Sequence, residues 1–93
     1  GSSSSIQKID GIYGLSLFPN PSTNELNIQI NSDRNSTASL SITDLTGKVV
    51  YFENISISDL YTQKIDISSF GKGMYFLNLT NDTGSMIVKF IKQ

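Results

Sequence analysis

The chain has 93 residues, of which 38% are hydrophobic and 16% charged, and its formal net charge is −1. A chain of this length folds as one domain around a single two-layer core. Its near-neutral charge excludes the basic footprint of a nucleic-acid-binding protein and the polybasic patch that binds anionic lipid.

The residue types that are missing narrow the possible chemistry. The chain contains no Cys and no His, so disulfides, the usual nucleophile–base pairs, and thiolate or imidazole metal sites cannot be built. Its eight Asp and Glu residues are scattered and form no evident acid–base pair. No apolar run approaches the roughly 20 residues that span a bilayer. We therefore expect no enzyme, no cofactor, no metal site and no direct membrane insertion.

The N-terminal residues are expected to be a lead-in to the fold. Residues 1–13 are rich in Ser and Gly and lack hydrophobic periodicity, which is typical of a flexible linker or a cloning scar. The folded domain is expected to cover residues 14–93. Leu15–Phe18 begins an alternating run that stops at Pro19-Asn20-Pro21. Because proline cannot donate to a strand ladder, this tripeptide is expected to form an extended edge or a kink.

The middle of the chain alternates between apolar and polar residues. Residues 26–30 and 38–42 each show the period of two that predicts a half-buried strand. The segment Asp44-Leu45-Thr46-Gly47 predicts a tight turn, since Asp favours the start of a type I turn and Gly supplies a positive φ. A return strand is expected over residues 48–52.

The next segments are less regular. Ile55 and Ile57 alternate with Ser, but residues 54–60 could form either a strand or a loop. Ile65 and Ile67 indicate another strand.

The end of the chain predicts a β-hairpin. Apolar-rich residues 73–79 and 86–91 flank the turn cluster 81–84, so the chain end is expected to be held in a sheet. Tyr75 is expected to point inward and to donate its hydroxyl to a nearby backbone group, as in the tyrosine corner of Ig-like sandwiches. Alternation places Met86, Val88 and Phe90 inward and Lys89 outward, where a lysine hinders strand pairing.

These segments together predict the fold class. About seven short strands, with turn signals roughly every 8–12 residues and no sustained helical period, are typical of an antiparallel β-sandwich. We therefore expect an all-β, Ig-like antiparallel β-sandwich.

Three motifs occur in a familiar order. The segments L-x-L-F-P-N-P-S, D-L-T-G-K-V-V and F-G-K-G-M-Y, followed by V-K-F-I, cover about residues 15–93. In this order they resemble the type A C-terminal sorting domain of the type IX secretion system of Bacteroidota. The resemblance implies an Ig-like sandwich at the C-terminus of a cargo protein, with the N-terminal cargo domain lying outside this chain.

The resemblance also implies a route and partners. Such cargo folds in the periplasm and crosses the outer membrane through a translocon, after which a surface sortase usually removes the sorting domain. The partners are therefore proteins of the translocon and the sortase, and the cargo ends on the cell surface or secreted. No oligomeric state is implied. Cleavage would fall upstream of Leu15, in the lead-in.

The resemblance assigns sorting-motif positions, with no catalytic or metal-binding residue among them. Phe90 is a mild departure, because smaller aliphatic residues are usual at that position. The positions are Pro19, Asn20, Pro21, Gly47, Lys48, Gly73, Tyr75 and Lys89.

Two other functions are weighed against a sorting signal. The first is a fibronectin-III-like adhesive or carbohydrate-binding module; the chain has no Trp for a sugar platform, and only Tyr13, Tyr51 and Tyr61 could replace it. The second is an inert spacer domain of a secreted enzyme, which no sequence feature excludes.

Overall fold

The computed structural model describes residues 9–93 and contains seven β-strands. Within that range no helix is long or apolar enough to cross a bilayer. The strands are β1 (Ile12–Phe18), β2 (Glu25–Ser32), β3 (Ser36–Asp44), β4 (Val49–Ile57), β5 (Leu60–Asp66), β6 (Gly73–Asn81) and β7 (Gly84–Lys92).

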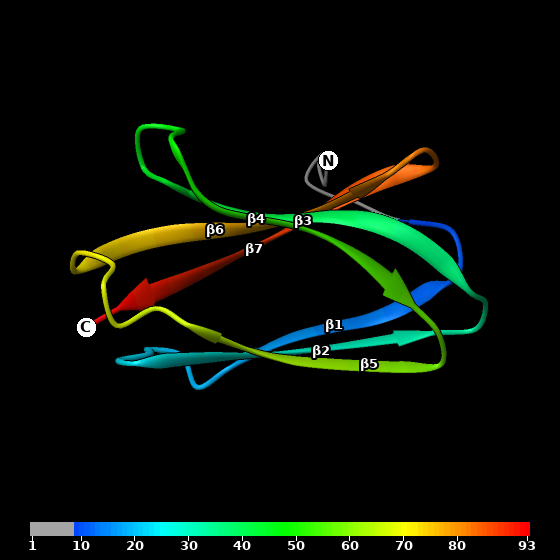
Figure 1. The fold of residues 1–93 in the computed structure, drawn as a ribbon, viewed down its shortest axis with the longest axis horizontal. Helices are drawn as coiled ribbons and strands as arrows, with labels where there is room; N and C mark the ends of the chain where they lie inside the picture. Colours follow the sequence, from blue (N-terminus) through cyan, green and yellow to red (C-terminus); the bar gives the residue numbers. More distant parts are fainter. Residues whose placement is uncertain (1–8) are drawn as a thin grey trace, which may run out of the picture.

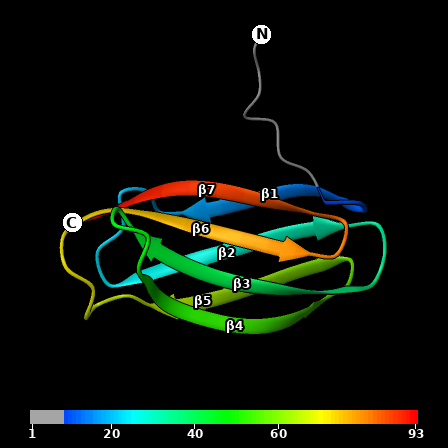
Figure 2. The same cartoon turned by 90° about the horizontal axis from the view of Figure 1, so that it is seen from above.

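The strands form two antiparallel sheets that pack face to face (Figure 1). The three-stranded sheet has the order β1-β2-β5, and the four-stranded sheet has the order β4-β3-β6-β7. The edge strands β1 and β7 lie on one side of the sandwich, and β4 and β5 lie on the other (Figure 2). The predicted all-β, Ig-like antiparallel sandwich is therefore confirmed.

The core lies between the sheets and follows the period of two along each strand. Leu26, Ile28 and Ile30 of β2 are buried against the inward side chains of the facing sheet. Removing apolar side chains from water is the main force that holds such sheets together. The buried residues of the facing sheet are Ala38, Leu40, Ile42, Ile55, Ile57, Tyr75, Leu77, Leu79 and Phe90.

The segment that the sequence left open between strand and loop is largely strand. β4 continues to Ile57, and its residues Ile55 and Ile57 are buried. Ala38 of β3 pairs with Ile55, and Ser36 pairs with Ile57. The long partner strand β3 therefore keeps β4 extended beyond the point where its own sequence is distinctive.

The predicted flexible lead-in is wrong for residues 9–13. Ile9 is fully buried, Ile12 is the first residue of β1, and the Ile12 amide donates to the Ile9 carbonyl at 3.1 Å. These two isoleucines are separated by Asp10 and Gly11, so they show no strand period although both join the core. The rest of the predicted lead-in, residues 1–8, lies outside the described residues.

Candidate functional site

The predicted motif loops gather at one end of the sandwich. β1, β3, β5 and β7 finish at this end, so residues 19–24, 45–48 and 67–72 lie there together with Lys92 and Gln93 (Figure 1, left). We call this the motif end. Seven of the motif positions that the resemblance assigns lie in or directly beside its loops. The eighth, on β7, is Lys89, whose register partner is Phe76.

Backbone hydrogen bonds join the first motif to the last strand. The Ser22 amide donates to the Ile91 carbonyl at 2.8 Å, and the Gln93 amide donates to the Ser22 carbonyl at 2.7 Å. The Asn20 side-chain oxygen accepts from the Ile91 amide at 3.1 Å. Ser22 is fully buried, and its hydroxyl donates to the Pro19 carbonyl. We call these contacts between residues 20–22 and 91–93 the clasp.

The clasp gives the Pro-Asn-Pro segment a role that the sequence did not reveal. The sequence predicted an extended edge or a kink here, and Ser22 was not among the assigned positions. Asn20 and Ile91 are 71 residues apart. The loop that leaves the three-stranded sheet therefore holds the end of the four-stranded sheet, and nothing in either local segment signals this contact.

The turn between β3 and β4 is built around one carboxylate. Asp44 Oδ1 accepts from the Thr46 hydroxyl at 2.6 Å, the Thr46 amide at 2.8 Å and the Lys48 amide at 3.1 Å. The Thr46 hydroxyl, followed by the two amides, holds the pKa of Asp44 below its usual value. Gly47 has φ +89°, a conformation that side-chain-bearing residues rarely adopt. Gly47 is thus explained by the turn, while the exposed Lys48 is free to contact a partner.

Tyr75 is a structural residue of the motif end. Its hydroxyl donates to the Gly71 carbonyl at 2.7 Å, and its ring stacks on Phe90 with centroids 5.7 Å apart. The ring centroid of Phe70 lies 5.3 Å from that of Tyr75. The predicted tyrosine corner is confirmed, and it anchors the loop between β5 and β6. Gly73, which opens β6, has φ +146°.

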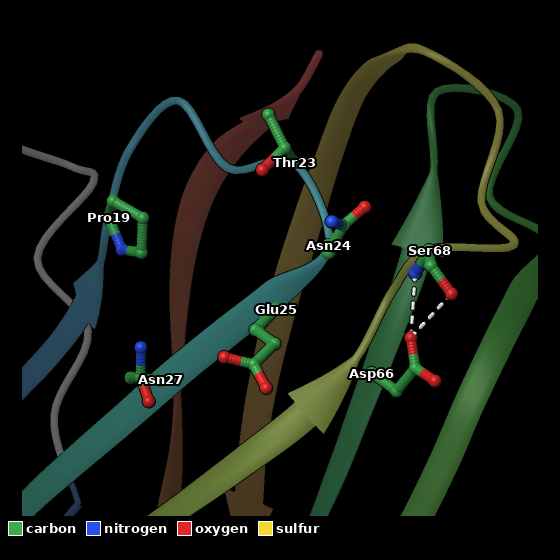
Figure 3. A pocket seen from close by; sticks show the side chains of 7 residues that line it. All are labelled: Pro19, Thr23, Asn24, Glu25, Asn27, Asp66 and Ser68. Atoms are coloured by element: carbon green, nitrogen blue, oxygen red, sulfur yellow. Dashed lines mark hydrogen bonds between the residues drawn. The ribbon is translucent and has the colours of Figure 1, made fainter.

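A polar depression lies on the three-stranded side of the motif end (Figure 3). Glu25 and Asp66 face each other across β2 and β5, but Asp66 Oδ1 already accepts from the Ser68 amide at 2.9 Å and its hydroxyl at 2.7 Å. The Ser68 hydroxyl and amide keep the pKa of Asp66 low. Lys64 lies 4.0 Å from Glu25. Across residues 9–93, no three Asp or Glu side chains gather where a metal ion could bind.

A network of side-chain hydrogen bonds links the edge strands β4 and β5, on the side of the sandwich away from β1 and β7. The Gln63 side-chain amide donates to Glu53 at 2.6 Å and to the Tyr51 hydroxyl at 3.1 Å. The Tyr51 hydroxyl donates to Glu53 at 2.5 Å, and the Tyr61 hydroxyl donates to the Gln63 side chain. Two of the three tyrosines that a sugar platform would need are therefore held between the sheets, and Tyr13 alone is widely exposed, at 73%.

This network predicts that Tyr51 loses its proton at a higher pH than an ordinary tyrosine. Burial, and then the neighbouring Glu53 carboxylate, raise the pKa of Tyr51 from 10.0 to about 12. The folded state thus favours the protonated phenol, and the stability that Tyr51 contributes is present below pH 10 and lost as the pH rises towards 12. Tyrosinate absorbance should show a late component that becomes smaller in Tyr51→Phe, where Tyr61, whose pKa burial and then Glu53 also raise, still contributes to it. A single transition near pH 10 in the folded protein would contradict the network.

Comparisons with known proteins agree with this geometry. Residues 16–93 match a family model described as "Secretion system C-terminal sorting domain". Among solved structures, the chain is similar to the crystal structure of dimeric latent PorU from Porphyromonas gingivalis, with 23% sequence identity and a TM-score of 0.69. The match covers 90% of this chain and 10% of that chain, and at this identity it shows a shared fold. None of the curated proteins matches the sequence.

Proposed function

Because this chain belongs to the secretion system C-terminal sorting domain family, we propose that its motif end is the surface by which the type IX secretion machinery recognises it. Cargo joined ahead of the domain is then carried across the outer membrane with it and delivered to the cell surface or the medium. A sortase of the machinery removes the domain from the cargo after export. The domain itself performs no chemistry.

The observation that carries this proposal is the convergence of the motif loops at one end of the fold. The loops come from both sheets, and the clasp between Ser22 and Ile91 joins them. A folded partner-binding surface explains why three motifs far apart in sequence occur together. The strands bury their apolar residues in one shared core, so the surface can form independently of the attached cargo, as a signal for many cargoes requires.

The first test is an export assay. The 93-residue chain is fused behind a periplasmic reporter in a host with a working type IX system, and the reporter is measured in periplasm, surface and medium. We expect the intact fusion on the surface or in the medium, and a fusion lacking β7 (Gly84–Lys92) in the periplasm. An intact fusion that stays in the periplasm would favour an inert spacer domain, and export of the truncated fusion would also contradict the proposal.

A point variant separates recognition from folding. Lys48 is exposed at the motif end, and Arg34 is exposed in the loop between β2 and β3 at the far end of the sandwich. Lys48→Glu should lower export several-fold at unchanged melting temperature, because charge reversal at a recognition surface repels the partner. The matched control Arg34→Glu makes the same change of charge far from the motif end and should be exported like the unmodified fusion. Equal export of the two variants would remove Lys48 from the recognition surface.

A further inference from the structure

On the outer face of the four-stranded sheet, the side chains of β4, β6 and β7 are mostly apolar near the motif end and polar towards the far end. Near the motif end, Met74 pairs with Ile91 and Thr43 pairs with Val49. In the far half the outward residues are polar, and the cross-strand partners there are Thr80 with Ser85 and Ser39 with Asn54. The outward residues of β3 and Asn78 are polar in the near half too, so Val49 and Phe52 on β4 are separated from the apolar residues of β6 and β7 by Ser41 and Thr43. The apolar side chains of the near half are Val49, Phe52, Met74, Phe76, Ile87 and Ile91, which we call the outer apolar patch.

The apolar side chains of this patch are exposed to water, although the sheet can form with polar residues on this face. Val49, Phe52, Ile87 and Ile91 are 40–59% exposed. The far half of the same strands shows that Ser, Thr and Asn are accepted on this face. Exposing apolar surface to water is unfavourable by about 25 cal/mol per Å², and clustered apolar residues on a small soluble domain mark an interaction site.

A lysine lies within the patch. Lys89 is exposed, its register partner is Phe76, and Ile87 and Ile91 flank it on β7. Neither of the two ion pairs among residues 9–93 includes Lys89, and the sequence of residues 1–8 contains no Asp or Glu.

Lys89 is the charged side chain among the described outward residues of the four-stranded sheet. The exposed Lys48 and Lys72 lie in loops at the adjoining motif end. Asp44 lies beside Lys48 at the motif end, and the far end carries Asp33, Arg34, Asp59 and Asp82, so the loops at neither end carry charge of one sign alone. The charge that the patch itself carries is therefore positive, which favours a partner that carries negative charge.

We propose that the outer apolar patch docks an acidic, apolar protein segment of the secretion machinery. Aliphatic or aromatic side chains of the partner cover the patch, and one partner carboxylate accepts a charge-assisted hydrogen bond from the Lys89 ammonium. The proposal rests on the proposed function and adds the chemistry of the partner. We expect the contact to bury less than about 1,200 Å² in total and to be transient, as a step of capture and release requires.

Export of charge variants tests the surface. Lys89→Glu should lower export of the reporter fusion at least about tenfold, because like charges across an interface repel, whereas Lys89→Arg should keep most of it. Thr80→Glu is the matched control, since Thr80 is exposed on the same face in its polar half, and it should be exported normally. Melting temperatures of the three purified variants should agree, because both positions are exposed.

Cross-linking tests the chemistry of the partner. A water-soluble carbodiimide condenses an amine with a carboxylate into an amide, while the reagent takes up the water as a urea. We would treat the fusion bound to detergent-solubilised outer membranes of the export host and sequence the linked peptides. We expect Lys89 joined to an Asp or Glu of a machinery protein, whereas Lys64 should be joined only within its own chain, to Glu25 at 4.0 Å. Linkage of Lys89 to a second copy of this chain, with dimers in sedimentation, would overturn the assignment.

The outcomes separate the two proposals. Normal export of the intact fusion with equal export of Lys89→Glu and Thr80→Glu would reject the docking surface and leave the sorting function standing. An intact fusion retained in the periplasm would reject both.

Discussion

Replacing Phe90 with alanine is expected to lower the free energy of unfolding by about 3–5 kcal/mol. The Phe90 side chain is fully buried on β7, where its ring stacks on Tyr75. Removing it loses the apolar transfer energy of the ring and leaves a cavity beneath the tyrosine corner. Domains of this size are stable by only about 5–15 kcal/mol, so the variant should lose a large share of its stability.

Urea unfolding followed by circular dichroism measures this effect. The matched control is Phe52→Ala on β4, whose ring is 59% exposed, and it should change stability by less than about 0.5–1 kcal/mol. Phe90 stands where the resemblance implies a smaller aliphatic residue, and the structure shows the larger ring of Phe90 filling the core between the sheets. A Phe90→Ala midpoint equal to that of the unmodified chain would show that the ring does not contribute to this core.

Replacing Ser22 with proline is expected to open the clasp. Proline has no amide hydrogen, so the Ile91 carbonyl loses its donor, and the Ser22 hydroxyl bond to Pro19 is lost as well. The two lost hydrogen bonds contribute about 0.5–1.5 kcal/mol each to stability. Hydrogen exchange of the Ile91 and Gln93 amides should accelerate at least about tenfold, since about 1.4 kcal/mol corresponds to a factor of ten.

Ser22→Ala is the matched control for the clasp. It keeps both backbone hydrogen bonds and removes only the hydroxyl, so it should lose less stability and keep slow exchange at Gln93. In Ser22→Pro, the exchange rates of amides in the centre of β3 and β6 should rise less than those of the Ile91 and Gln93 amides at the clasp. If Ile91 and Gln93 exchange at unchanged rates in Ser22→Pro, the clasp does not hold the end of β7 in solution.

The export assays and the clasp experiment address different aspects of the motif end. Ser22 is buried and acts by holding the last strand in place, whereas Lys48 and Lys89 are exposed and can contact a partner directly. We therefore expect Ser22→Pro to reduce export together with stability, and Lys48→Glu to reduce export alone.

The amino-acid sequence by itself determined the strands and their inward faces. Alternation at Leu40, Ile42, Leu77 and Leu79 predicted which side chains are buried, because the two faces of a strand are set by a period of two that is local to the chain. The turn at Gly47 was equally readable, since its positive φ is a demand of one residue.

The tertiary structure alone decided how the motif residues meet. Ser22 and Ile91 pair across two sheets, Ile9 is buried beyond any local period, and the outer apolar patch joins residues of three strands. These contacts depend on strand order and register, which bring together residues as far apart as Asn20 and Ile91. Local sequence sets which side of a strand is apolar, but only the pairing of the strands determines which surfaces become neighbours.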